Sequence, residues 1–202
     1  MRQSLHLDRD QKVSVISSHF REIMETLGLD LQDPSLTRTP ERVAKMYVDE
    51  IFSGLDPDTI PEMSFMENVG NTGSMIFTKA AVQSTCEHHF VPMQGDAYIA
   101  YIPKNKLIGL SKIPRLVRFF SKRPQVQERL TRQIAEALSK LLETEDVAVS
   151  TTLEHSCVRA RGIEDTASLT TVNTFLGCFK SDEMRQKEFF LTLSRGVGVH
   201  SW

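Results

Sequence analysis

The chain has 202 residues, of which 40% are hydrophobic and 25% are charged, and its formal net charge is −2. This length and composition predict one large globular domain, or one domain with an appendage. The near-neutral balance excludes the broad basic field that is typical of nucleic-acid-binding proteins, so any anion site must be local. Because the chain has three cysteines and no long apolar run, we expect reduced thiols, a cytoplasmic location and no contact with a membrane.

Two amphipathic helices are predicted in the first quarter of the chain. Apolar residues recur at spacings of three and four over residues 10–27, which is typical of one helical stripe. Thr39 and Pro40 form the start signal of a second helix that continues to about residue 54. Arg42 and Lys45 share one face of this helix, and by themselves they indicate a solvated surface.

Residues 55–73 contain several prolines and glycines with little periodicity, which is typical of a linker. We therefore divide the chain into an N-terminal helical region with a linker, residues 1–70, and a catalytic domain, residues 71–202. Within the second part, the pattern predicts four strands and three helices. The strands are expected at 74–84, 96–102, 146–154 and 168–176, and the helices at 113–120, at 124–141 and at 182–195.

This order of elements predicts an α+β domain with an antiparallel sheet and helices on one face, preceded by the N-terminal helices. The loop between the first two strands contains the densest chemistry of the chain. Cys86, Glu87, His88 and His89 follow one another there, and a single turn can point Cys86 and His89 at one spot. A thiolate and an imidazole are ligands that zinc prefers.

Cys157 is the candidate for a third zinc ligand. If residues 155–161 are extended, His155, Cys157, Arg159 and Arg161 share one face, because side chains in a strand alternate. Three protein ligands leave the fourth position of zinc for water, as in catalytic sites. The alternatives are a closed structural zinc with His88 or Cys178 as its fourth ligand, or three unrelated buried thiols.

Two helix starts carry candidate substrate contacts. Ser111 and Lys112 precede the helix at 113–120, where free backbone N–H groups favour an anion, although a simple capped start explains them equally well. Gln127 and Glu128 lie in the first turn of the longest helix. The helix dipole alone could account for a carboxylate at that place.

Taken together, these motifs make the chain resemble GTP cyclohydrolase I. The resemblance covers nearly everything beyond the first few residues, and it rests on a set of long motifs in a fixed order. The motifs are TPERVAKM at 39–46, CEHH at 86–89, GLSK at 109–112, RPQVQERL at 123–130 and CVRARG at 157–162.

The resemblance implies the tunnelling fold, a decamer of two stacked pentameric rings, and active sites at subunit interfaces. It implies that Cys86, His89 and Cys157 bind zinc and that His88 and His155 transfer protons. Glu128, helped by Gln127, corresponds to the anchor of the guanine edge. The triphosphate and ribose contacts correspond to Ser111, Lys112, Arg115 and Arg161, and Arg42 and Lys45 are further triphosphate contacts. Ser111 is also counted with the catalytic residues.

The implied reaction begins with zinc-activated water attacking C8 of GTP. Ring opening and loss of formate follow, and rearrangement of the ribose with ring closure gives 7,8-dihydroneopterin triphosphate, the entry to folate and pterin synthesis. Two other functions stay open. One is another tunnelling-fold enzyme, such as a 7-cyano-7-deazaguanine reductase with a nucleophilic cysteine, and the other is a non-catalytic, zinc-stabilised module that binds a nucleotide.

Overall fold

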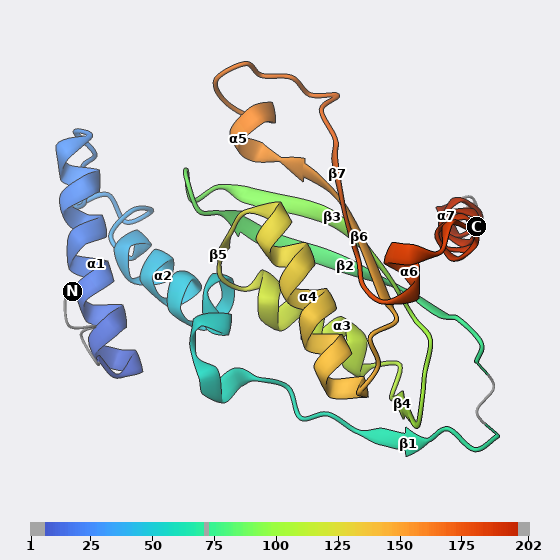
Figure 1. Ribbon diagram of the computed structural model, residues 1–202. Coiled ribbons are helices and arrows are strands. Elements are labelled where there is room, and N and C mark those ends of the chain that lie inside the picture. Colours follow the sequence, from blue (N-terminus) through green and yellow to red (C-terminus); the bar gives the residue numbers. More distant parts are fainter. Residues whose placement is uncertain (1–6, 71–72, 198–202) are drawn as a thin grey trace, which may run out of the picture.

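The computed structural model describes residues 7–70 and 73–197, with the side chains of residues 196 and 197 left out. Its centre is a five-stranded sheet in the order β5-β2-β3-β6-β7 (Figure 1). The strands are β2 (Ile76–Cys86), β3 (Pro92–Tyr101), β5 (Pro124–Gln125), β6 (Val147–His155) and β7 (Thr170–Phe175). All neighbouring pairs are antiparallel except β2 and β5, which run parallel.

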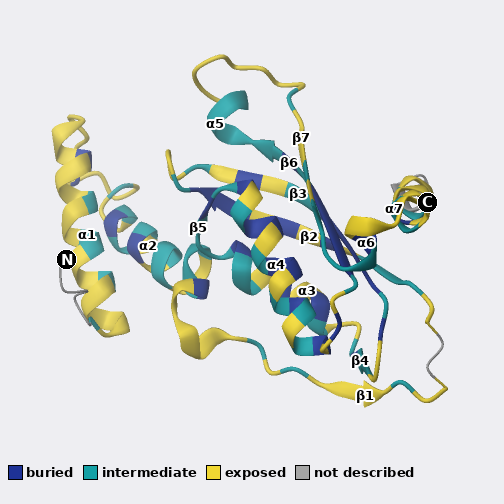
Figure 2. Cartoon of the chain, viewed as in Figure 1, coloured by how far each residue is buried: buried dark blue, intermediate teal, exposed yellow. Residues whose placement is uncertain are grey.

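Two long helices, α3 (Lys112–Ser121) and α4 (Gln127–Leu142), pack on one face of this sheet. Both helices bury apolar stripes, with Leu116 on α3 and Ile134 on α4 as examples, and strands β2, β3 and β6 contribute alternate residues to the same core. Figure 2 shows the buried residues concentrated along these strands and on the inner sides of α3 and α4. The predicted α+β architecture is confirmed.

The opposite face of the sheet is partly covered by the C-terminal segment. Helix α6 (Cys178–Ser181) and helix α7 (Glu183–Val197) bring Phe179 and Phe189 against Tyr98 in a second, smaller cluster. Helix α7 was predicted at 182–195, close to its observed position. The rest of this face is hollowed by a cavity of about 640 Å³, which is lined by residues of β2, β3 and β6 and by Leu193 of α7.

The N-terminal helices lie beside the sheet, at its β5 end (Figure 1). Helix α1 spans Arg9–Thr26, and helix α2 spans Thr39–Lys45 and continues into a π-helical segment, η1, at Met46–Ile51. Both predictions of a helix are confirmed. Thr39, however, lies inside α2 and makes no capping bond, because Arg38 occupies the position before the first turn.

The linker carries short ordered elements: η2 (Ser53–Leu55), η3 (Pro57–Thr59) and β1 (Phe65–Glu67). Strand β1 pairs with β4 (Lys106–Ile108) in a separate two-stranded sheet. Gly54 is in close contact with α3, since a Cβ atom there would lie 2.2 Å from the Phe119 carbonyl oxygen. The division at residue 71 stays a prediction, and residues 71 and 72 lie outside the described chain.

Two details of the prediction were wrong. The proline at 124 does not open the longest helix, because Pro124 and Gln125 pair with the end of β2 and α4 begins only at Gln127. The segment after β6 is not extended, because α5 (Ser156–Arg159) forms one helical turn there. In the described part of the chain, no helix is long and apolar enough to cross a membrane.

Candidate active site

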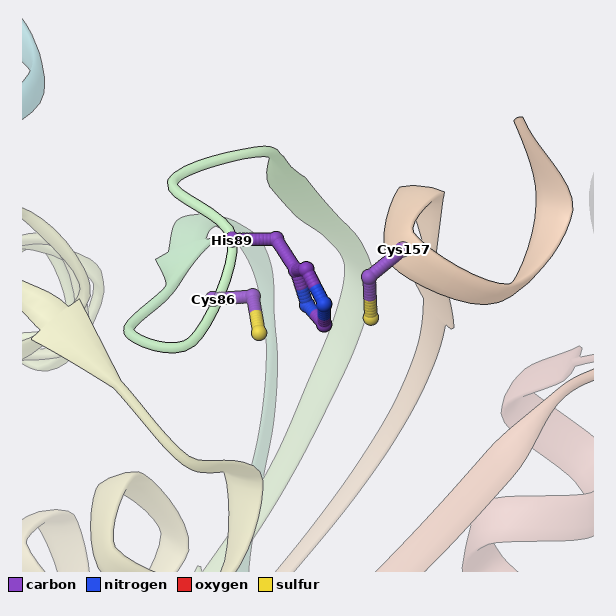
Figure 3. Close-up of side chains that lie close together, drawn as sticks. All are labelled: Cys86, His89 and Cys157. Atoms are coloured by element: carbon purple, nitrogen blue, oxygen red, sulfur yellow. The ribbon is translucent and has the colours of Figure 1, made fainter. Parts of the chain in front are cut away.

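The three predicted zinc ligands come together at one end of the sheet. Cys86 ends β2, His89 lies in the turn that follows, and Cys157 lies in α5. Their ligand atoms are all within 4.8 Å of one another, and Figure 3 shows the side chains of Cys86 and Cys157 on the two sides of the His89 ring. Two neighbouring residues, Cys86 and His89, and a third that lies 68 positions after His89 thus form one soft donor set.

The turn that carries His89 is held by backbone hydrogen bonds on both sides. Cys86 N–H donates to the Val91 carbonyl at 2.9 Å, and Phe90 N–H donates to the Cys86 carbonyl at 2.9 Å. Phe90 adopts a left-handed conformation, with φ at 56°, and its ring packs edge-on against Phe52 with centroids 5.2 Å apart. The turn at residues 87–89, called the metal turn below, therefore contacts the segment that follows α2.

Cys157 reaches the cluster in a way that the sequence analysis did not foresee. The expected strand alternation would have aligned it with Arg159 and Arg161, but β6 ends at His155 and α5 turns the chain. Arg159 instead forms an ion pair with Glu154 at 2.9 Å. Burial, with a smaller contribution from the Cys86 thiol, raises the pKa of the Cys157 thiol above its ordinary value.

Cys178 is not a fourth ligand within this chain. It begins α6, packs with the second apolar cluster and donates its backbone N–H to Asp146 at 2.8 Å. Burial raises the pKa of its thiol to about 11. Among the described residues, the group that can hold a metal therefore consists of Cys86, His89 and Cys157.

Both histidines predicted for proton transfer lie next to the cluster. His88 is exposed, and its Nδ1 lies 3.8 Å from the Cys86 sulfur. His155 is half-buried at the end of β6, and its Nε2 lies 2.8 Å from Oε1 of Gln127. Burial lowers the pKa of His155, while the nearby Glu128 carboxylate acts in the opposite direction.

The first turn of α4 faces this end of the sheet with residues of different exposure. Glu128 is exposed and close enough to His155 to act on its charge, so it is free to contact a ligand. Gln127 is only 2% exposed, and both ends of its side-chain amide are engaged within the protein. Gln127 therefore lies on the buried side of His155, and Glu128 lies on the side that faces solvent.

The predicted triphosphate contacts lie at the start of α3 and beyond α5. Ser111 is exposed and makes no capping bond, so its hydroxyl is free of the role that a simple capped start would give it. Arg115 lines a cavity of about 170 Å³ together with Arg118 and Lys122, where burial and Arg118 lower the pKa of Lys122. Three cations therefore converge on one small cavity.

The remaining basic residues lie at different distances from the cluster. Lys112 is half-buried at the first position of α3. Nη1 of Arg161 lies 3.1 Å from Nε2 of His89, which brings this guanidinium to the metal turn itself. Arg42 and Lys45 are exposed on α2, and Lys45 pairs with Glu41 at 2.5 Å. Over residues 7–70 and 73–197, no hydrogen bond or ion pair links either of them to the cluster.

One supporting interaction was missed by the sequence analysis. Arg129 forms an ion pair with Glu87, the residue between Cys86 and His88, and also donates to Gln125 Oε1 at 2.9 Å and to the Pro124 carbonyl at 3.2 Å. The Arg129 guanidinium lowers the pKa of the Glu87 carboxyl. Glu87 stood out in the sequence as the charged residue within the cluster, but nothing local identified Arg129 as its partner.

A third cavity lies away from the metal ligands. It has a volume of about 800 Å³ and is enclosed by α1, η1 and the segment that follows, including Arg9, Asp49 and Phe52. The described residues that line it include none of the predicted site residues. The chemistry of the chain therefore concentrates at the end of β2 and β6, and not in this larger space.

Comparison with known proteins places these residues in context. The family model described as GTP cyclohydrolase I matches residues 16–194. A protein named GTP cyclohydrolase 1 from Aeromonas hydrophila is 54% identical over 190 residues, which cover 94% of this chain and 87% of that protein. One of the same name from Serratia proteamaculans is 53% identical over 193 residues, covering 95% and 87%. A solved structure of an archaeosine synthase, QueF-like, in the apo form is 16% identical to this chain, with a TM-score of 0.44. The match covers 52% of this chain and 94% of that one.

Proposed function

Because the chain belongs to the GTP cyclohydrolase I family, we propose that it converts GTP and water to 7,8-dihydroneopterin triphosphate and formate with the help of zinc. The observation that carries this proposal is the convergence of Cys86, His89 and Cys157 beside His88 and His155. Such a product would enter the synthesis of folates and pterins.

The donor set fits zinc. Two thiols and one imidazole from two distant segments lie within 4.8 Å of one another, and this combination suits a soft-to-borderline divalent cation with tetrahedral geometry. When bound by three protein ligands, zinc supplies a Lewis acid that activates water near neutral pH. Cys86, His89 and Cys157 would hold the ion, and the Arg129–Glu87 pair would steady the turn that begins after Cys86 and carries His89.

Recognition of the base is assigned to Glu128. An exposed carboxylate in the first turn of α4 can accept hydrogen bonds from both the ring N–H and the exocyclic amine of guanine. Its position near His155 would place the bound purine between the guanine anchor and the groups that transfer protons. Adenine lacks both of these donors, so this contact favours GTP over ATP.

Proton transfer is assigned to His155 and His88. Opening the imidazole ring of GTP after water adds to C8 requires a group that takes a proton and a group that returns one to the leaving nitrogen. Burial lowers the pKa of His155 and so favours its neutral form, which suits it to take the proton, and His88 on the exposed side of the cluster would return one. Ser111 would assist at the ribose.

The triphosphate would be bound by basic residues from several elements. Arg115 in its cationic cavity, Lys112 at the start of α3 and Arg161 beside the metal turn offer charged donors, which form stronger hydrogen bonds to phosphate oxygens than neutral donors do. Arg42 and Lys45 would add to them from α2. In this proposal the site is shared between copies of the chain in a decamer of two stacked pentamers.

A turnover assay tests the proposed function. Purified protein with zinc is incubated with GTP, and formate release and a fluorescent pterin after oxidation are measured. Both products are expected from GTP and neither from ATP. If zinc-loaded protein released no formate from GTP, the proposed function would be wrong.

The same assay separates the two other functions. A 7-cyano-7-deazaguanine reductase needs a free cysteine nucleophile and a nicotinamide cofactor, whereas both cysteines near the site belong to the predicted ligand set. Oxidation of a nicotinamide cofactor in the presence of a deazapurine nitrile would favour the reductase. Tight binding of GTP without any product would favour a non-catalytic module.

A further inference from the structure

The side-chain amide of Gln127 occupies a buried position between α4, β6 and β7. Its Nε2 donates to the backbone carbonyl oxygens of Thr151 and Thr170, each at 3.0 Å, and lies 3.1 Å from the Thr151 hydroxyl. Thr131 reinforces the arrangement, because its hydroxyl lies 2.7 Å from that of Thr151. Three elements of the fold therefore hold this one amide in place.

These contacts determine which end of the amide faces His155. Carbonyl oxygens can only accept hydrogen bonds, so the NH2 group of Gln127 must point at Thr151 and Thr170. Its Oε1 is then the atom that lies 2.8 Å from Nε2 of His155. An amide oxygen also can only accept, and the hydrogen of this bond must therefore come from the imidazole.

We propose that Gln127 is a positioning residue for His155, which fixes the ring in the tautomer with hydrogen on Nε2 and leaves the lone pair on Nδ1 free to accept a proton. The inference rests on the proposed function for its catalytic meaning. In this proposal Gln127 acts through His155 and not by direct contact with guanine, because its side chain is 2% exposed and hydrogen-bonded within the protein at both ends.

The physical effect is orientation of a general base. A neutral imidazole has one donor nitrogen and one acceptor nitrogen, and a partner that satisfies the first determines where the second points. Without the Gln127 oxygen, the His155 ring could rotate about its side-chain bonds or exchange tautomers, and the productive arrangement would be populated only part of the time. The loss would then appear in the catalytic rate and not in the binding of GTP.

Gln127→Met tests this role, because methionine keeps the length and volume of the side chain but makes none of the hydrogen bonds. We expect zinc content to be retained, kcat to fall about 10- to 100-fold and KM for GTP to stay within about twofold. Gln186→Met is the matched control: Gln186 is also partly buried and donates to a carbonyl, that of Phe179 at 2.7 Å, but it lies on α7. Its kcat should equal that of the wild type.

A double-mutant cycle distinguishes positioning from a structural role. If Gln127 acts through His155, adding Gln127→Met to His155→Ala should cause no further loss of kcat. An equal loss in both backgrounds would overturn the inference, and a raised KM with unchanged kcat would return Gln127 to guanine binding. Should Gln127→Met fail to fold, Gln127→Asn supplies the same test, because its shorter amide cannot reach both His155 and the two carbonyls.

Nitrogen NMR of labelled histidine tests the tautomer without any turnover. The His155 ring should carry hydrogen on Nε2 in the wild type and become a mixture of tautomers in Gln127→Met, and hydrogen on Nδ1 in the wild type would overturn the inference. This readout also separates the two proposals. A wild type that is inactive on GTP would refute the proposed function, whereas the NMR result would still decide the hydrogen bond between Gln127 and His155.

Discussion

At the scale of single residues, His155 and Cys157 lie two positions apart and are expected to fail in different ways. Cys157→Ala removes one of three donors, so zinc content and formate release should both be lost. His155→Ala leaves the donor set whole, so zinc content should stay normal while turnover falls about 10²- to 10⁴-fold. Metal analysis and a formate assay on both proteins check this.

Removal of the metal complements that comparison. Dialysis of the wild type against a chelator should abolish formate release, and added zinc should restore it, whereas zinc should not rescue Cys157→Ala. Full metal content with normal formate release in Cys157→Ala would remove this cysteine from the ligand set.

Glu128 should separate recognition of the base from chemistry at C8. Loss of hydrogen bonds to a charged group costs about 1.5–3 kcal/mol, so Glu128→Ala should bind GTP much more weakly and lose its preference for GTP over ATP. Zinc content and fold should be kept. Affinities for both nucleotides and the melting temperature are the measurements.

Glu136→Ala is the matched control for Glu128, because Glu136 is an exposed carboxylate on the outer face of the same helix, 3.9 Å from Arg132. Its nucleotide affinities should equal those of the wild type. Near-normal GTP binding by Glu128→Ala, with a lowered melting temperature, would leave Glu128 with a helix-dipole role only.

At the scale of elements, α4 and the metal turn are joined by the Arg129–Glu87 pair. Arg129 is itself held by Gln125 Oε1 at 2.9 Å, and Glu87 N–H donates to the Gln125 carbonyl at 3.0 Å. The short strand β5 thus connects helix and turn through both backbone and side chain. This explains why residues 124 and 125 are extended and do not begin the helix.

Arg129→Met should therefore loosen the turn between Cys86 and His89. We expect zinc affinity to fall about 10- to 100-fold, because groups that orient metal ligands have effects of that size. Arg132→Met is the control, since Arg132 is exposed on the same helix and, among the described residues, its ion pair is with Glu136, at 3.9 Å. Competition with a chromophoric zinc chelator gives both affinities, and equal values for the two variants would show that the ion pair does not support the site.

At the scale of the whole molecule, the sheet of a single chain is open at both edges. Strand β7 pairs with β6 only, and the part of β2 before Thr85 pairs with β3 only, within the described residues. Unpaired edges are available to a neighbouring copy. In the decamer proposed above, these two edges are where the sheets of neighbouring copies would pair.

The size of the assembly and the turnover per chain should consequently change over the same range of protein concentration. We expect light scattering to give a mass of many copies at assay concentrations, and turnover per chain to fall over the same dilution range in which the mass falls. Mass and activity measured on one dilution series test this. Full turnover by a single chain would contradict a site shared between copies.

The sequence by itself determined the features that depend on the order of residues within one short segment. Helices α1, α2, α3 and α7, the four long strands and the α+β class followed from periodicity and turn residues, and the CEHH cluster with Cys157 identified the donor set. Segments that are long and strongly periodic carry enough local information for this. The long motifs also carried the resemblance to the family to which the chain belongs.

Only the tertiary structure decided how neighbouring residues divide their roles. Gln127, Glu128 and Arg129 follow one another, yet one is buried behind His155, one faces solvent and one holds Glu87. Each outcome depends on a partner 28 to 42 positions away or on the angle at which α4 meets the sheet. The helical turn at Cys157 likewise ends a strand whose sequence favours continuation, because side-chain packing and long-range hydrogen bonds override local propensity where distant segments meet.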